Sequence, residues 1–174
     1  MKVFISIGII YGSTTGNTEH VAALIAAKIG DAAVLHNIVD LGISGIEDYQ
    51  VCIFGIPTWD FGELQEDWLD CWDELLRLNL VGKPCAIFGL GDQIGYGEWF
   101  LDAMGALHTL LVDSGAKLAG YWPNEGYKFE ASKALTPDGR YFVGLALDED
   151  SQAAESEERI DEWLKMLEPM LALS

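Results

Sequence analysis

Short apolar runs alternate with amphipathic helical patterns along almost the whole sequence. The apolar runs predict strands over 3–11, 33–39, 50–56, 84–90, 117–122 and 141–147. Most of these runs are hydrophobic at nearly every position, as in Val51-Cys52-Ile53-Phe54, which is typical of strands covered on both faces of a parallel sheet. Strands and helices that alternate in this way are joined by right-handed crossovers, so the chain is restricted to α/β folds.

The helical patterns lie between the predicted strands. The first covers residues 16–29, where Val21 and Ile25 share one face and Gly30 follows as a stop signal. Later apolar stripes run over 64–75, 100–111 and 160–167. We therefore expect a doubly wound sandwich of three layers, with helices on both faces of a five-stranded parallel sheet.

One stretch, residues 123–140, breaks this rhythm. It has no clean period, and Gly126, Pro137 and the Asp138-Gly139 turn interrupt it. We interpret it as an insertion that divides the last strand into two pieces. The sequence shows no linker and no repeat, and 174 residues is the length of about one domain, so a single domain over 1–174 is expected.

The charge balance limits the partners. The chain has 28 acidic and 10 basic residues, a formal net charge of −18. Affinity for nucleic acids and anionic membranes comes largely from Lys and Arg, so we expect no nucleic acid and no membrane partner. The basic face of a partner protein fits this charge.

The first residues and the cysteines predict a cytoplasmic protein. The apolar start has no cleavage pattern of a signal peptide, and no apolar run is long enough to cross a bilayer. The cysteines are odd in number, form no CxxC pair and lie in apolar stretches, so we interpret them as reduced core residues: Cys52, Cys71 and Cys85. The scattered histidines predict no metal site: His20, His36 and His108.

The loop after the first predicted strand, Gly12 to Thr18, is a candidate phosphate site. Ligands of open α/β sheets bind beyond the carboxyl ends of the strands, and the free N–H groups of a helix start favour an anion there. Asn17 stands where a P-loop needs lysine, and the loop contains no Lys or Arg. A phosphate in this loop would therefore be held by dipoles and hydroxyls. The alternative is an ordinary turn in which Ser and Thr cap the helix.

Two further loops each carry an aromatic residue outside any helical stripe. Trp59 follows the third strand and Tyr96 the fourth, and either can present a flat face to a planar ligand. Asp92 offers an acceptor for a ring N–H. The tryptophans on helical stripes are instead expected to serve packing alone: Trp68, Trp72 and Trp163. A phosphate loop and two aromatic plates at one sheet edge predict a site for a planar ring with a phosphate tail, which is the shape of FMN.

Three segments resemble the flavodoxins, specifically the long-chain bacterial type: Ser13–Thr18, Pro57–Glu63 and Gly91–Tyr96. The tail from Phe142 to Asp150 is also similar, and the resemblance covers almost the whole chain. It implies a flavodoxin-like fold with strand order 2-1-3-4-5, for which flavodoxin itself is the standard example. The break at 123–140 matches the insertion that splits the fifth strand of long-chain members.

The resemblance also implies the roles of individual residues. The hydroxyls and amide of the first loop would hold the FMN phosphate, Trp59 and Tyr96 would stack on the two ring faces, Asp92 would accept from the ring N3–H, and backbone near Asp60 would meet N5. The residues expected at the cofactor are Ser13, Thr14, Thr15, Gly16, Asn17, Thr18, Pro57, Thr58, Trp59, Asp60, Phe61, Gly62, Gly91, Asp92, Tyr96 and Asp150.

The implied function is low-potential, one-electron transfer between redox proteins, such as a flavodoxin reductase and its acceptors, by a monomer that is not an enzyme. The acidic residues between Asp60 and Glu74 are interpreted as the docking face for basic partners, and a solvated helix surface is the plainer alternative.

A second possible function is an FMN-dependent NAD(P)H quinone or nitro reductase of the same fold. That enzyme would need an open ring face and a nicotinamide site. A response-regulator receiver is disfavoured because Tyr11-Gly12 and Ile56-Pro57 stand where it needs acidic residues.

Overall fold

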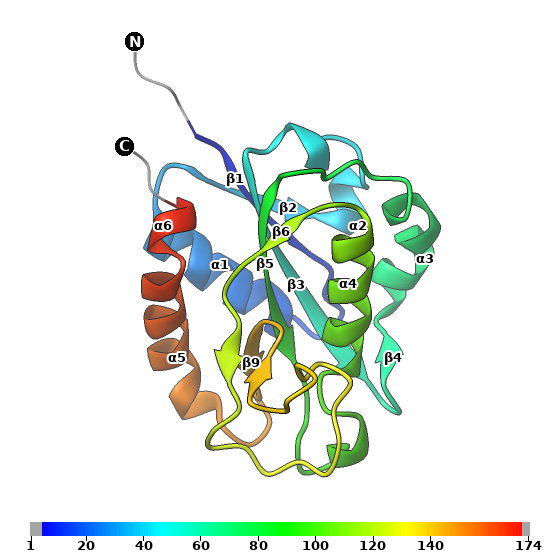
Figure 1. The fold of residues 1–174 in the computed structure, drawn as a ribbon, viewed down its shortest axis with the longest axis vertical. Helices are drawn as coiled ribbons and strands as arrows, with labels where there is room; N and C mark the ends of the chain where they lie inside the picture. The colour runs from blue at the N-terminus through cyan, green and yellow to red at the C-terminus, as the bar shows by residue number, and fades with distance from the viewer. Residues whose placement is uncertain (1–4, 172–174) are drawn as a thin grey trace.

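A computed structural model describes residues 5–171 of the chain (Figure 1). The main sheet contains β1 (Ile7–Tyr11), β2 (Ala33–Asn37), β3 (Val51–Trp59), β4 (Glu63–Leu64), β5 (Pro84–Leu90), β6 (Lys117–Leu118) and β9 (Leu145–Leu147). Its order is β2-β1-β3-β5-β6, while β4 pairs with β3 and β9 pairs with β5. Every pair is parallel except β3 with β4. With β5 as the fourth strand and β6 and β9 as two pieces of the fifth, the predicted order 2-1-3-4-5 is confirmed. Residues 3 and 4 of the first predicted strand lie outside the described residues.

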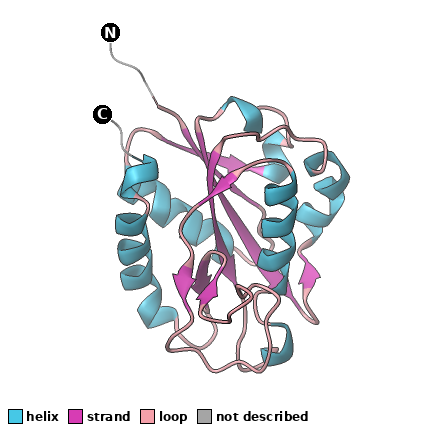
Figure 2. Cartoon of the chain, viewed as in Figure 1, coloured by secondary structure: helices cyan, strands magenta, loops and turns pink. Residues whose placement is uncertain are grey.

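Helices cover both faces of this sheet (Figure 2). They are α1 (Asn17–Ile29), α2 (Ile38–Leu41), α3 (Glu66–Leu75), α4 (Asp102–Asp113), α5 (Ala153–Met166) and α6 (Glu168–Leu171), with short 3-10 turns at Ile46–Asp48 and Gly97–Trp99. Figure 1 shows α1 and α5 on one side of the sheet and α3 and α4 on the other. The predicted three-layer α/β sandwich is confirmed. The four predicted helical stripes correspond to α1, α3, α4 and α5.

The strands are hydrophobic on both faces because both faces are covered. Neighbouring positions Ile9 and Ile10 of β1 are both fully buried, although successive side chains of a strand point to opposite faces. Phe54 of β3 packs on Trp68 of α3, with ring centroids 6.4 Å apart. Phe88 of β5 packs on Trp163 of α5 at 6.5 Å. Each large apolar side chain buried in this way stabilises the fold by about 1.5–3 kcal/mol.

The fifth strand is interrupted, as predicted, but over a longer segment than 123–140. β6 pairs with the start of β5 and β9 with its end. Between them, β7 (Trp122–Pro123) and β8 (Tyr141–Phe142) pair antiparallel with each other. Because these four residues pair outside the main sheet, the predicted strands 117–122 and 141–147 are each shortened. The insertion therefore covers residues 119–144.

β3 runs three residues past its predicted end at 56, because Thr58 and Trp59 pair with Leu64 and Glu63 of β4. The turn between the two strands is tight. Its residue Asp60 has φ 42°, in the left-handed region that L-residues seldom adopt. Pro57, Thr58 and Trp59 thus lie on an ordered strand end rather than in a loop.

The three cysteines are free thiols, as predicted. Cys52 of β3 lies opposite Cys85 of β5, and both are fully buried. Cys71 of α3 is half-buried rather than part of the core, and burial raises the pKa of its thiol to about 11. Among helices within residues 5–171, none has both the length and the apolar composition that a bilayer crossing requires.

Gly105→Ala should destabilise the protein, although alanine is normally better than glycine in a helix by about 0.8–1.0 kcal/mol. A Cβ at this position of α4 would overlap the backbone carbonyl of Lys133 in the insertion. Overpacking of this kind typically costs about 1–3 kcal/mol. Urea unfolding measures the change. The exposed neighbour provides a control, Ala106→Ser, which should alter the free energy of unfolding by no more than about 0.5 kcal/mol. Unchanged stability of Gly105→Ala would contradict the close approach.

Asp60→Gly should be more stable than Asp60→Ala by about 1 kcal/mol, because a left-handed backbone costs an L-residue about 1–2 kcal/mol and costs glycine little. Both variants remove the carboxylate, so their difference isolates the backbone. At Asp73, exposed in α3, the same pair of substitutions should give the opposite order because glycine weakens helices. Chemical denaturation of the four variants tests this, and the same order at both positions would argue against strain at residue 60.

Candidate functional site

A cavity of about 340 Å³ lies at the carboxyl ends of β1, β3 and β5, the edge where the strand order reverses. Its volume falls in the range of about 300–1,000 Å³ that is typical of small-molecule sites. It is lined by Thr15, Asn17, Thr18, Pro57, Thr58, Trp59, Asp60, Leu90, Gly91, Asp92, Tyr96, Glu149 and Asp150. The structure therefore brings together eleven of the sixteen predicted cofactor residues; Ser13, Thr14, Gly16, Phe61 and Gly62 do not line the cavity.

One end of the cavity is formed by the start of α1. Gly16 precedes the helix in a left-handed conformation, with φ 92°, and no side chain caps the helix. The first helical hydrogen bond is made by the N–H of His20 to the Gly16 carbonyl. Among the described residues, no acceptor meets the N–H groups of the three residues before His20. These open amides and the helix dipole favour an anion at this end of the cavity.

The hydroxyls between Ser13 and Thr18, in the loop before α1 and in its first turn, divide into two groups. Thr15 and Thr18 line the cavity, together with Asn17. Ser13 Oγ instead accepts from the N–H of Gly16 at 3.1 Å, and Thr14 Oγ1 accepts from Gln65 Nε2 at 2.9 Å. Ser13 and Thr14 thus help to hold the loop in shape, and because each hydroxyl only accepts in these bonds, the direct phosphate contact predicted for them stays a prediction.

Two aromatic residues, Trp59 and Tyr96, also line the cavity. Trp59 ends β3 and is half-buried, and Tyr96 lies just before the turn at Gly97–Trp99 and is 38% exposed. Phe61 is not a lining residue but packs edge to face on Tyr96 and Trp99, with centroid distances of 6.1 and 4.9 Å. It therefore braces Tyr96 from outside.

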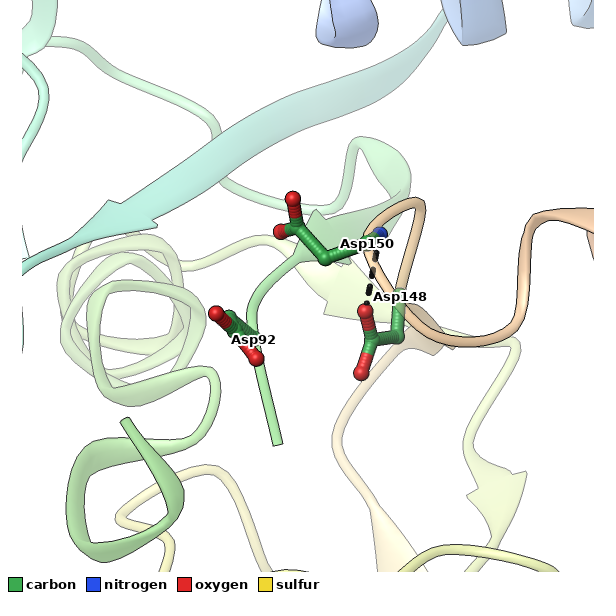
Figure 3. A group of neighbouring side chains, drawn as sticks. All are labelled: Asp92, Asp148 and Asp150. Atoms are coloured by element: carbon green, nitrogen blue, oxygen red, sulfur yellow. Dashed lines mark hydrogen bonds between the residues drawn. The ribbon is translucent and has the colours of Figure 1, made fainter. Parts of the chain in front are cut away.

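Three aspartates meet at the rim of the cavity, with carboxylate oxygens within 4.8 Å of one another (Figure 3). Asp92 Oδ1 accepts from the N–H groups of Ile94 and Gly95 at 3.1 and 2.7 Å, which leaves Oδ2 for the predicted contact with a ring N–H. Both oxygens of buried Asp148 already accept from backbone and side-chain donors, so the cluster offers few free ligand atoms to a cation.

Burial alone would raise the pKa of Asp148, but hydrogen bonds from Ser151 and Gln93 hold that pKa below its usual value. The pKa of Asp150 is raised, first by burial and then by the charges of Asp92, Asp148 and Glu149. Among the residues that the structure describes, the cavity is lined by four carboxylates and by no Lys or Arg: Asp60, Asp92, Glu149 and Asp150. An anion at the start of α1 would therefore be held by neutral donors, and further negative charge in the cavity would be disfavoured.

Two lining residues, Leu90 and Glu149, were not predicted from the sequence. Leu90 is the last residue of β5 and reads as an ordinary buried strand residue. Glu149 comes directly before Asp150, which was predicted at the cofactor, and this position next to a predicted residue was the one sequence signal for it. Gln65, which fixes Thr14, was also missed, because nothing in the sequence relates two residues so far apart.

The chain matches the family described as Flavodoxin over residues 9–163. Flavodoxin 2 of Escherichia coli K12 is 53% identical over 163 residues, which cover 93% of this chain and 94% of that protein. Flavodoxin 1 of the same strain is 44% identical over 167 residues, covering 95% and 94%. A crystal structure of Fusobacterium nucleatum flavodoxin bound to flavin mononucleotide has a TM-score of 0.89 at 29% identity and covers 95% of this chain and 98% of that one. With the split fifth strand and the cavity at the reversal of strand order, these similarities show that the chain belongs to the flavodoxin family.

Proposed function

We propose that this protein is a low-potential, one-electron carrier that binds FMN without a covalent bond and shuttles electrons between redox proteins. Flavodoxins are electron-transfer proteins rather than enzymes, so no catalytic residues are needed. One observation carries the proposal: an uncapped helix start and two aromatic side chains, Trp59 and Tyr96, border the same cavity of about 340 Å³. A planar ring with a phosphate tail matches both features. FMN supplies the one-electron redox chemistry when it is bound.

The phosphate would be held by the open N–H groups at the start of α1, with Thr15, Asn17 and Thr18 as side-chain donors. Ser13, Thr14 and Gly16 would act through the shape of the loop. No residue other than Gly fits position 16 without strain, since its φ is 92°. In this arrangement the FMN phosphate would be bound by neutral N–H, hydroxyl and amide groups alone.

The ring would lie between Trp59 and Tyr96, with Asp92 and Asp150 near its polar edge. Phe61 would support Tyr96, and Asp60 and Gly62 would supply the turn next to the ring. Two aromatic plates leave no free ring face on which a nicotinamide could stack, and this disfavours the quinone or nitro reductase alternative. Steady oxidation of NADPH by the purified protein alone would establish that alternative.

The acidic lining supports a low potential. An electron added in the cavity meets four carboxylates and no cation. Each elementary charge about 10 Å away contributes on the order of 0.4–0.8 kcal/mol at an effective dielectric constant of about 40–80, before salt screening. The sum makes the fully reduced carrier a strong electron donor.

The partners of an electron carrier are redox proteins, and we infer that their docking faces are basic. The acidic side chains of the β3–β4 turn and α3 form the acidic face, which begins at the cavity with Asp60 and continues along α3: Asp60, Glu63, Glu66, Asp67, Asp70, Asp73 and Glu74. Negative charges that lie together on a surface make its electrostatic potential more negative, and this potential steers positively charged partners toward it. A flavodoxin reductase is one partner of this kind. We further propose that the protein works in the cytoplasm as a monomer of one domain.

Trp59→Ala and Tyr96→Ala should each weaken FMN binding by about 1–3 kcal/mol, by analogy with the stacking of aromatic side chains on bases. Titration of the apoprotein, followed by the quenching of FMN fluorescence, measures this. Tyr141→Ala removes a tyrosine that is 41% exposed and does not line the cavity, and should leave the affinity unchanged. Riboflavin, which lacks the phosphate, should bind more weakly than FMN. Equal affinities for all three variants, or no FMN binding by the wild type, would count against the proposal.

The rate at which the reduced protein donates electrons to a basic cytochrome should fall with salt, by roughly 10-fold or more from low to high ionic strength. Replacing Asp70 and Asp73 by Asn should lower both the rate and its salt dependence. The matched control replaces Glu158 and Glu162 of α5, on the opposite side of the sheet, by Gln (Figure 1). Stopped-flow measurements over a range of salt concentrations decide, and an equal effect of the two pairs would refute docking through the acidic face.

A further inference from the structure

The Tyr96 loop (residues 91–97) is fastened on its outer side to the insertion. The N–H groups of Glu130 and Ala131 both donate to the Gly97 carbonyl, at 2.8 and 3.0 Å. The N–H of Phe100 donates to the Ala131 carbonyl at 3.3 Å. The backbone of the insertion at residues 130 and 131 is therefore hydrogen-bonded to the end of the Tyr96 loop, which contributes residues to the cavity lining.

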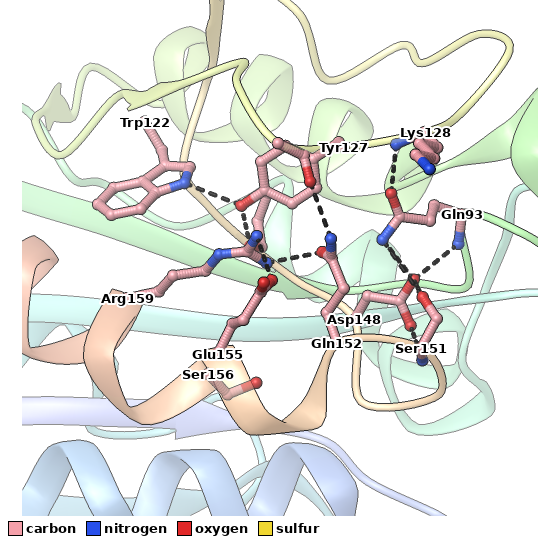
Figure 4. A network of polar contacts seen from close by, with 12 residues as sticks. Gln93, Trp122, Tyr127, Lys128, Asp148, Ser151, Gln152, Glu155, Ser156 and Arg159 are labelled. Atoms are coloured by element: carbon pink, nitrogen blue, oxygen red, sulfur yellow. Dashed lines mark hydrogen bonds and ion pairs between the residues drawn. The ribbon is translucent and has the colours of Figure 1, made fainter.

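Gln93 lies inside this loop, between the lining residues Asp92 and Tyr96, and is only 3% exposed (Figure 4). Its backbone N–H and its Nε2 donate to Asp148 Oδ2, at 3.1 and 2.8 Å. Nε2 also lies 3.3 Å from Ser151 Oγ, and Oε1 accepts from the N–H of Lys128 in the insertion. One side chain thus joins three segments that are far apart in the sequence.

Asp148 is the other half of this junction. It is fully buried and opens the Asp148 turn (residues 148–151), where Oδ1 accepts from the N–H groups of Asp150 and Ser151 at 3.0 and 2.9 Å. Its depressed pKa keeps it ionised, so its bonds are charge-assisted and stronger than neutral ones. Asp150 and its neighbour Glu149 line the cavity. The bond between Gln93 and Asp148 therefore ties one rim of the cavity to another.

We propose that Gln93 is a positioning residue for the cofactor: through Asp148 it fixes the spacing between the Tyr96 loop and the Asp148 turn, and it couples both to the insertion. Gln93 does not line the cavity, so it would act through Tyr96 and Asp150 rather than by touching FMN. This inference rests on the proposed function, because it concerns the geometry of the flavin site. The competing explanation is that Gln93 only fastens the insertion to the fold.

The chain holds a second glutamine that separates these explanations. Gln152 also fastens the insertion, since its Nε2 donates to the Gly126 carbonyl and its Oε1 accepts from Arg159, both at 2.8 Å. Arg159 lies 4.4 Å above the ring of Tyr127, whose hydroxyl donates to the Ala146 carbonyl at 2.6 Å. None of these contacts reaches the Tyr96 loop. The Gln152 side chain is therefore a matched control that binds the insertion to α5.

The experiment compares Gln93→Met and Gln152→Met. Both should lower the thermal stability of the apoprotein, whereas Gln93→Met alone should weaken FMN binding by about 10-fold or more, the effect of losing a hydrogen bond to a charged group. Gln93→Met should also change the visible circular dichroism of bound FMN and shift its midpoint potentials, which a merely structural role would leave unchanged. Gln152→Met should stay within about twofold of the wild-type affinity. Equal affinity, spectra and potentials in the two variants would overturn the proposal.

A second variant keeps the test decisive if Gln93→Met does not fold. In Gln93→Glu the new carboxylate faces Asp148 at neutral pH, with Asp92 and Asp150 close to Asp148 and Lys128 in the insertion as the other charged neighbours. Lowering the pH protonates the new carboxyl, and its O–H can then replace the Nε2 donor to Asp148. The ratio of variant to wild-type FMN dissociation constants should therefore fall as the pH falls. A ratio independent of pH would overturn the proposal, and a wild type that binds no FMN would overturn the proposed function with it.

Discussion

The pairing of β1 with β2 on one side and with β3 on the other governs the site. Because the chain leaves β1 and β3 in opposite directions along the sheet, the connections that follow them separate and leave a crevice at their carboxyl ends. The start of α1, the end of β3 and the loop after β5 all reach this one edge. The parallel strands that carry these segments are buried on both faces, so the three segments are attached to the core of the molecule.

The divided fifth strand extends that support to the rim. β6 completes only the start of β5, and the chain then leaves the sheet for the insertion before β9 completes the end. On this excursion it passes close over α4 at Gly105, bonds to Gly97 and Gln93, and docks on α5 through Tyr127. Burial raises the pKa of the Tyr127 hydroxyl to about 12, so this group keeps the proton that it donates to Ala146. The Tyr96 loop is therefore fixed from two sides.

Hydrophobic periodicity predicted where the main strands and the four longer helices lie along the chain, since both faces of the sheet are covered and each strand is an apolar run, whereas the order of the strands within the sheet came from the resemblance. Trp59 and Tyr96 could be singled out because they stand outside any helical stripe. The end of β3 could not be predicted, because it depends on pairing with the two residues of β4. The turning of Thr14 toward Gln65 and the junction at Gln93 depend on side chains 51 and 55 positions away, which no local pattern encodes.

The start of α1 carries open amides and hydroxyls but no Lys or Arg, in a chain with a formal net charge of −18. An anionic ligand held there gains nothing from a fixed cation and is repelled at longer range by the whole molecule. Dissolved ions screen that repulsion, and they would equally screen the attraction of any basic partner to this protein. Ionic strength would therefore act in opposite senses on the two associations: a rise would weaken the binding of a basic partner and strengthen the binding of the anionic ligand.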